Sequence, residues 1–135
     1  MRKSTLSNLI FLALLLAVAC RSSKVQTARE DFDEFYEKFL TDSSFQMERI
    51  QFPLPGIKTT GEEEDSDSTY HWTRDEWVML KKPNLEGTEF ERKLQVSDTL
   101  ATDEIFTENA GFYFKMVYEP VKRKWHLVYM VDSGL

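Results

Sequence analysis

The stretch GFYFKMVYEPVKRKWHLVYMVD, residues 111–132, decides the fold that this sequence predicts. In each half, apolar side chains recur at every second position, which is typical of β-strands. One face carries Phe112, Phe114, Met116 and Tyr118 in the first half, and Trp125, Leu127, Tyr129 and Val131 in the second. His126, Val128 and Met130 fall on the opposite face of the second half, and PVKRK between the halves predicts a hairpin loop. The stretch therefore predicts an antiparallel hairpin with one strongly apolar face.

Two further strands precede the hairpin. TEFERKLQVS, residues 88–97, alternates with Phe90, Leu94 and Val96 on one side, and DEIF, residues 103–106, predicts a short strand. Together the four segments predict an antiparallel meander.

The clearest helix lies near the start of the mature chain, in TAREDFDEFYEKFLTD, residues 27–42. Thr27 and Glu30 have the spacing of a capping box, and acidic residues fill the first turns. One helical face carries Phe32, Phe35, Tyr36, Phe39 and Leu40. This aromatic stripe predicts a helix that packs on a sheet. Helices followed by an antiparallel sheet predict an α+β fold, with the N-terminal helices packed on one sheet face.

Two shorter helices and one extended segment are expected between the first helix and the meander. Ser43 and Gln46 predict the cap of a short helix, and FPLP at 52–55 predicts an edge strand or extended segment. A capping box at Thr73 and Glu76, with Trp72 and Trp77 in the places of a hydrophobic staple, predicts a helix that Pro83 ends.

The charge of the chain argues against a nucleic-acid partner. The net charge is −6, and removal of the first nineteen residues, which hold two basic and no acidic side chains, would make it −8. Nucleic-acid binding needs a basic face that displaces counterions from phosphates.

An acidic run at 62–67 raises the question of a calcium site. Asp65, Asp67, Thr69 and Glu76 have EF-hand spacing, but Tyr70 stands where the loop requires glycine, and no helix precedes it. We interpret the match as chance, and we expect no metal and no other cofactor.

The amino terminus indicates export. Arg2 and Lys3 precede LIFLALLLAVA at 9–19, which is too short to span a bilayer and predicts a secretory signal peptide over residues 1–19. Cys20, the one cysteine of the chain, follows directly. Ala17-Val18-Ala19 is also a site for ordinary secretion, but release would leave Cys20 as an exposed, unpaired thiol in an oxidising compartment. Residues 20–30 are therefore expected to be a lipidated cysteine and a tether, and residues 31–135 the folded domain.

The start LAVA-C resembles the lipobox of bacterial lipoproteins, in which the cysteine receives diacylglycerol. The segments DFDEFYEKFLTDSSFQMERIQFPL at 31–54, the paired tryptophans, GFYFKMVY at 111–118 and KWHLVYMVD at 124–132 resemble a bacterial lipoprotein family of unknown function. That family has the nuclear transport factor 2-like, or cystatin-like, α+β cone. The resemblance implies a curved antiparallel sheet around the first helix, often with a cavity and often dimerising through the sheet. It implies attachment to the cell envelope. Some lipoproteins carry a charged export tag just after the cysteine, and RSSK at 21–24 does not form one, which favours the periplasmic face of the outer membrane.

No motif for nucleophilic, phosphate-binding or zinc chemistry occurs in the sequence. We therefore expect a non-catalytic module that binds a small apolar or amphipathic ligand or an envelope protein. The expected pocket residues are aromatic: Phe35, Trp77, Phe112, Phe114, Trp125 and Tyr129.

Two alternatives stay open. One is a small isomerase or dehydratase of the same cone, which would use a buried aspartate and a tyrosine. Its candidate residues are Asp103, Asp132, Tyr113 and Tyr118. The other is a homodimer through an exposed apolar sheet face that contains Val128 and Met130.

Overall fold

A computed structural model gives the structure of residues 29–59, 69–109 and 111–134. Two helices come first, α2 (Phe32–Thr41) and α3 (Ser43–Glu48). Six strands follow: β1 (Leu54–Thr59), β2 (Tyr70–Trp72), β3 (Glu91–Val96), β4 (Ala101–Phe106), β5 (Tyr113–Val121) and β6 (Lys124–Ser133). The predicted signal peptide, Cys20 and the acidic run at 62–67 lie outside the described residues.

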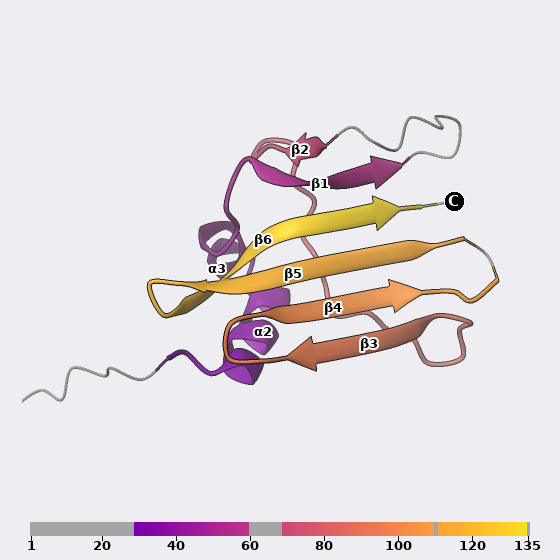
Figure 1. The fold of residues 1–135 in the computed structure, drawn as a ribbon, viewed down its shortest axis with the longest axis horizontal. Helices are drawn as coiled ribbons and strands as arrows, with labels where there is room; N and C mark the ends of the chain where they lie inside the picture. The colour runs from indigo at the N-terminus through magenta and orange to yellow at the C-terminus, as the bar shows by residue number, and fades with distance from the viewer. Residues whose placement is uncertain (1–28, 60–68, 110, 135) are drawn as a thin grey trace, which may run out of the picture.

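The six strands form one sheet in the order β2-β1-β6-β5-β4-β3, and both helices lie on one face of it (Figure 1). The predicted α+β class and the meander from β3 to β6 are confirmed. The sheet is mixed, however, because β1 runs parallel to β6. Leu127 starts this pairing, since its N–H donates to the carbonyl of Arg49 and its carbonyl accepts from the N–H of Gln51. The extended segment predicted at 52–55 thus leads into an internal strand, and β2 forms the edge.

Helix α2 carries the predicted aromatic stripe but begins later than predicted. Phe32, Phe35, Tyr36, Phe39 and Leu40 are all buried, as their spacing indicated. The cap is Asp31, whose carboxylate accepts the N–H of Glu34 at 3.0 Å, so the predicted capping box is wrong.

Glu30 does not cap the helix because it ties the helix start to the hairpin. Its carboxylate accepts two bonds from the Arg49 guanidinium, at 2.7 and 2.9 Å, and one from the Trp125 N–H at 2.8 Å. Burial raises the pKa of Glu30, but these bonds outweigh it and hold the pKa below its ordinary value.

Tyr118 is the centre of the core. The ring lies in β5 with no exposed surface, and four rings of α2 meet it edge-on with centroids 5.6–5.9 Å away. These four are the rings of Phe32, Phe35, Tyr36 and Phe39. Such edge-to-face contacts add to the burial of large apolar surfaces, so they fix how the helix lies on the sheet.

A β-bulge in the hairpin changes the predicted faces of β6. Val117 pairs with Tyr129 whereas the next residue, Tyr118, pairs with Leu127, so Val128 is an extra residue in its strand. Beyond the bulge the alternation is inverted. Met130 joins Trp125 and Leu127 on the helix-covered face and is only 4% exposed, while Tyr129 and Val131 pair with residues of the outer face. The predicted faces are therefore wrong after Leu127, and Met130 cannot contribute to an exposed dimer face with Val128.

The helix predicted from Thr73 to Pro83 does not form. Residues 70–72 are strand β2, and residues 77–85 are irregular. Gln46, which was expected to cap α3, instead lies buried and holds this segment. Its amide donates to the carbonyl of Leu80 at 3.0 Å and accepts the N–H of Leu80 at 2.9 Å and the indole N–H of Trp77 at 3.1 Å. Asp42 caps α3 in its place, accepting the N–H of Phe45.

We expect Tyr118→Ala to lower the free energy of unfolding by about 3–5 kcal/mol, because it removes a buried ring and leaves a cavity between β5 and α2. Urea unfolding followed by circular dichroism measures the loss. Tyr113→Ala, on the outer face of the same strand, is the matched control and should cost much less. Equal losses in the two variants would contradict the central place of Tyr118.

We expect Gln46→Met to lower the free energy of unfolding by at least about 2 kcal/mol, because three polar groups of residues 77–80 lose their partner while the side-chain volume is kept. Tryptophan emission should also shift to the red as Trp77 becomes exposed. Gln95→Met, on the exposed strand β3, is the control and should leave both quantities unchanged. An unshifted emission maximum in Gln46→Met would show that other contacts hold the segment.

Candidate functional site

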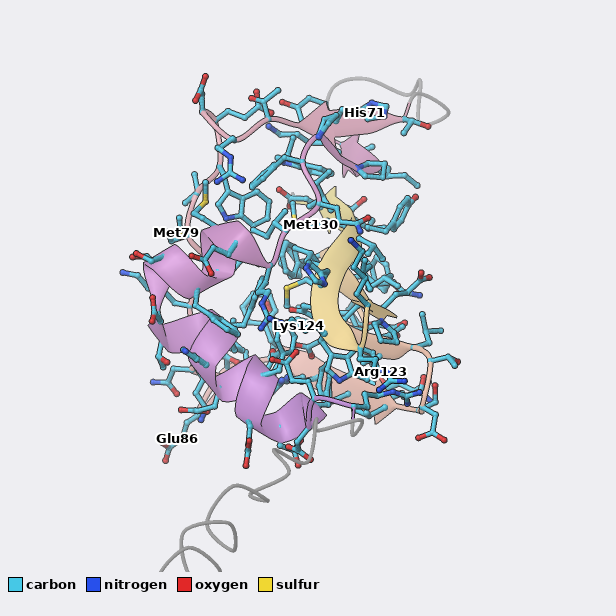
Figure 2. All side chains as sticks on the ribbon, turned by 90° about the vertical axis from the view of Figure 1, so that its left-hand side faces the viewer. His71, Met79, Glu86, Arg123, Lys124 and Met130 are labelled. Atoms are coloured by element: carbon cyan, nitrogen blue, oxygen red, sulfur yellow. The ribbon has the colours of Figure 1, made fainter. Side chains whose placement is uncertain are left out.

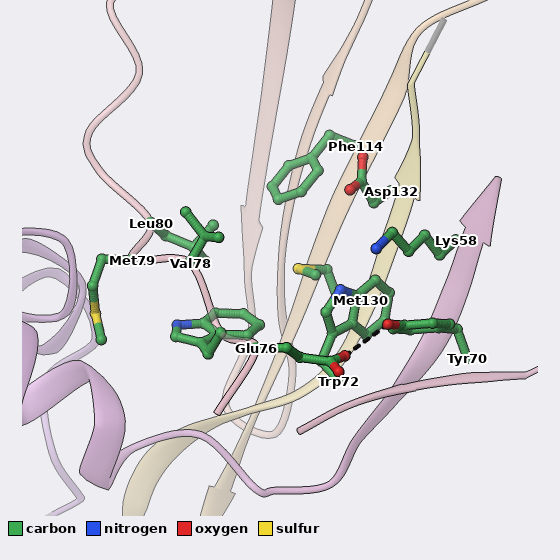
Figure 3. Close-up of a pocket in the computed structure, with 11 residues that line it drawn as sticks. Lys58, Tyr70, Trp72, Glu76, Val78, Met79, Leu80, Phe114, Met130 and Asp132 are labelled. Atoms are coloured by element: carbon green, nitrogen blue, oxygen red, sulfur yellow. Dashed lines mark hydrogen bonds between the residues drawn. The ribbon is translucent and has the colours of Figure 1, made fainter. Parts of the chain in front are cut away.

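A pocket of about 280 Å³ opens on the helix-covered face of the sheet, between β1, β2, β6 and the segment after β2 (Figure 3). Its volume lies just below the usual range for ligand sites, about 300–1,000 Å³, which suits a small molecule rather than a long acyl chain. Most of the wall is aromatic, aliphatic or thioether. The lining residues are Lys58, Tyr70, Trp72, Glu76, Trp77, Val78, Met79, Leu80, Phe114, Met130 and Asp132.

Trp72 forms part of the floor because Gly56 lets it lie against the sheet. A Cβ atom at Gly56 would come within 2.6 Å of the Trp72 ring and 1.7 Å of the Met130 carbonyl oxygen. Glycine is therefore required at this position for close approach, although its backbone is an ordinary strand. Trp72 is only 6% exposed, and its ring meets Tyr70 at 4.8 Å between centroids.

The indole N–H of Trp72 has no acceptor among the residues that the structure describes. Figure 3 shows this nitrogen on the pocket side of the ring, close to Met130. Within the described chain, the one buried side-chain polar atom without a partner is the Thr107 hydroxyl, so the Trp72 nitrogen reaches the open pocket and is available to a bound molecule.

Trp77 forms the opposite wall, and two contacts fix it. Its indole N–H donates to Gln46, and its ring meets Phe52 edge-on at 5.6 Å. Because both contacts come from outside the pocket, the wall is preformed.

Three charged side chains line the mouth, and they differ in how they are engaged. Tyr70 donates its hydroxyl proton to Glu76 at 2.7 Å, a bond that raises the pKa of Tyr70 and lowers that of Glu76. Lys58 places its ammonium 4.8 Å from the centre of the Tyr70 ring. Asp132 is paired with Lys58 across β1 and β6, but within the described chain no ion pair joins the two side chains. The mouth thus presents one cation and one carboxylate that are not neutralised by each other.

The structure places only two of the six expected pocket residues at this pocket, Trp77 and Phe114. Phe35 and Trp125 lie in the core, 1% and 2% exposed. Phe112 packs against Phe90 at 5.1 Å, at the far end of β5 from the hairpin turn. Tyr129 lies on the outer face because of the bulge.

Lys58, Trp72 and Met130 also line the pocket, although they were not among the expected pocket residues. Trp72 was assigned to a helix cap and Met130 to the wrong face of β6. The strand pattern of Tyr70 and Trp72 was a usable signal, since two aromatic residues spaced by two also fit a short strand.

A buried acid lies beside a tyrosine, but away from the pocket. Asp103 has no exposed surface; it accepts the hydroxyl of Tyr36 and two bonds from Arg92, at 2.8 and 3.1 Å. Burial, and then the bond to Asp103, raise the pKa of Tyr36 far above its ordinary value. Of the candidate tyrosines, Tyr118 bonds to the Met116 sulfur and Tyr113 is on the outer face. Asp103 lines no part of the pocket described above.

Two further features bear on the class of site. Among the described residues, no group of three or more histidine, cysteine, aspartate or glutamate side chains is arranged to hold a metal ion. Asp65 and Asp67 of the apparent calcium spacing lie outside those residues, and Glu76 bonds to Tyr70. Over the same part of the chain, no helix has the length and apolar character needed to cross a bilayer.

Solved structures similar to this chain come from Bacteroides. An NTF2-like protein of Bacteroides fragilis is 24% identical with a TM-score of 0.59, over 79% of this chain and 48% of its own, so the chain spans about half of its length. A cystatin-like protein of Bacteroides caccae is 22% identical with a TM-score of 0.58, over 78% of both chains. A protein of Bacteroides uniformis is 26% identical with a TM-score of 0.55, over 77% of both chains.

The comparisons agree on the fold, which the meander, the helix-covered face and the aromatic core already indicated. No curated protein matches the sequence. A protein-family model matches residues 30–133, the greater part of the chain. The chain therefore belongs to the family that this model describes, and it shares its fold with the NTF2-like and cystatin-like proteins of Bacteroides.

Proposed function

We propose that this protein is a lipid-anchored module of the bacterial cell envelope that binds a small amphipathic molecule in the pocket between β1, β2, β6 and residues 76–80, without transforming it. One observation supports the proposal that the pocket binds a small molecule. The pocket has a preformed aromatic wall and a mouth with polar groups that the protein does not use itself. Sites of this kind combine apolar surface for affinity with a few polar groups for orientation.

The pocket favours binding over catalysis because it does not bring together a candidate aspartate and a candidate tyrosine of the isomerase alternative: of the four, only Asp132 lines it. A general base needs a free carboxylate within hydrogen-bond reach of its substrate. Asp103 is held by Arg92 and Tyr36 and is buried away from the pocket. Asp132 does reach the pocket, but no tyrosine donor bonds to it there.

The anchoring half rests on Cys20, which follows the predicted signal peptide, and on its distance in the sequence from Glu30. Glu30 is ten positions after Cys20, so a tether from the lipid could extend about 35 Å at most. Glu30 is fixed to Arg49 and Trp125, at the hairpin end of β6. Stable anchoring takes about two acyl chains, which one diacylglycerol group supplies.

Glu30, which follows the proposed tether, and the pocket lie at different ends of β6. Trp125 and Asp132 are seven residues apart in this strand, which corresponds to about 23 Å. Figure 2 shows Arg123 and Lys124 lower in the molecule than Met79 and Met130. The proposed attachment therefore does not reach the pocket directly along β6, and a small solute can enter the pocket of an anchored protein. The periplasmic face of the outer membrane is the location we propose.

We expect the wild-type domain to bind a fluorescent apolar probe such as anilinonaphthalene sulfonate saturably, and Phe114→Ala to weaken the binding about tenfold through loss of apolar wall. Fluorescence titration gives the dissociation constants. Phe112→Ala, two residues away in the chain but outside the pocket, is the matched control and should bind as wild type does. Circular dichroism checks that both variants are folded. No saturable binding by the wild type, or equal weakening in both variants, would overturn the assignment of the pocket.

We expect Cys20→Ser to move the protein from the membrane fraction to the soluble fraction, or to leave the precursor uncleaved, when the full chain is produced in a Gram-negative bacterium. The reason is that serine cannot form the thioether to diacylglycerol. Fractionation followed by mass spectrometry of the intact chain measures both outcomes, and Ser22→Ala is the control. An unmodified cysteine at the mature terminus of the wild type would contradict the anchor while leaving the pocket untouched.

A further inference from the structure

From the charges at the pocket mouth we infer the class of ligand: an α-amino acid with an apolar side chain, bound as the zwitterion. This inference rests on the proposed binding function and narrows it. It is carried by three polar groups that the fold directs toward one space and that form no hydrogen bond or ion pair within the described chain, although Lys58 lies over the Tyr70 ring and its charge helps to lower the pKa of Glu76. These groups are the Lys58 ammonium, the Trp72 indole N–H and the Asp132 carboxylate.

The positions of Lys58 and Asp132 follow from strand register. They are directly paired residues of the parallel strands β1 and β6, on the face that carries Met130 and Gly56. Figure 3 shows both side chains pointing toward the pocket, with Trp72 below Lys58. Paired positions on neighbouring strands are about 5 Å apart, yet these two side chains form no ion pair in the described chain. A ligand group that carries both charges close together can satisfy both.

The donors and the acceptor lie in an order that matches a zwitterion. Lys58 and Trp72 offer N–H donors, which suit a carboxylate. Asp132 offers only acceptor oxygens, which suit an ammonium group. In an α-amino acid one carbon joins these two groups, so a single head group can span neighbouring strands.

Glu76, the third charge at the mouth, is already engaged. It accepts the hydroxyl of Tyr70, which leaves Lys58 and Asp132 as the pair available to the ligand. The Lys58 ammonium also lies 4.8 Å from the centre of the Tyr70 ring, a contact that helps to position it without neutralising its charge.

The remainder of the pocket accepts the apolar side chain. Phe114, Trp77 and Leu80 face the same space from β5 and from the segment held by Gln46. A volume of about 280 Å³ accommodates a molecule of amino-acid size. It does not accommodate a lipid with long acyl chains.

Four compounds that share a phenyl ring separate the contributions of the two ligand charges and of the apolar ring to the binding affinity. They are L-phenylalanine with both charges, phenylacetate with the negative one, phenethylamine with the positive one, and 2-phenylethanol with none. Tryptophan fluorescence or calorimetry gives each dissociation constant for the wild type. We expect L-phenylalanine to bind at least about tenfold more tightly than the other three.

The charged residues are tested by neutral variants with matched controls. Lys58→Met should weaken L-phenylalanine and phenylacetate about tenfold and leave phenethylamine unweakened. Asp132→Asn should weaken L-phenylalanine and phenethylamine and leave phenylacetate unweakened. Trp72→Phe should likewise weaken the binding of L-phenylalanine and phenylacetate and leave that of phenethylamine unweakened. Lys93→Met on β3 and Glu119→Gln on β5, both away from the pocket, should change nothing.

The outcomes distinguish failure of the amino-acid inference from failure of the proposed binding function. If 2-phenylethanol binds as tightly as L-phenylalanine, the inferred zwitterionic ligand class is wrong, whereas the proposed binding of an apolar ligand in this pocket is supported. If phenylacetate or phenethylamine binds best, the ligand carries a single charge and the inference fails. If none of the four binds and the fluorescent probe does not bind either, both the ligand class and the binding function fail.

Discussion

The packing of α2 against Tyr118 is the contact on which the rest of the structure depends. Four aromatic rings of one helix meet one buried ring of the sheet, and this fixes the helix over β4, β5 and β6. Because α2 is short, it covers only part of the face. The remaining part, beside β1 and β2, is closed by the irregular segment 76–80 instead of a helix. The pocket lies where the aromatic core ends and this looser cover begins.

Two local features decide which side chains reach the pocket. The bulge at Val128 turns Met130 toward the helix-covered face and Asp132 with it. Gly56 lets the Trp72 ring lie close to the backbone of β6. A single inserted residue changes the face of every residue that follows in a strand, so the bulge has consequences along the whole end of β6. The pocket is thus a product of register and close packing more than of composition.

The buried group of Tyr36, Asp103 and Arg92 shows why a polar cluster alone does not indicate an active site. A fully buried carboxylate is costly unless it is paired and hydrogen-bonded, and Asp103 has both kinds of partner. Its bonds connect α2 to β3 and β4, so it specifies how the helix and the sheet edge meet. The fold is shared with relatives of different lengths, and function is a matter of the site that each one carries.

The sequence by itself determined the elements whose signals are local. The aromatic stripe of α2 and the alternation in β3 and β5 follow from side-chain periodicity, DEIF at 103–106 predicted part of β4, and the order of these elements predicted the α+β class. Only the tertiary structure decided the parallel pairing of β1 with β6, the bulge at Val128 and the loss of the helix after Trp72. Each depends on a partner that the local sequence does not show. The parallel pairing depends on the bonds of Leu127 to Arg49 and Gln51, and the bulge on the pairing of Val117 with Tyr129. The loss of the helix depends on the bonds of Gln46 to Leu80. Long-range hydrogen bonds of this kind override local propensity, because a buried backbone group must be paired wherever the chain places it.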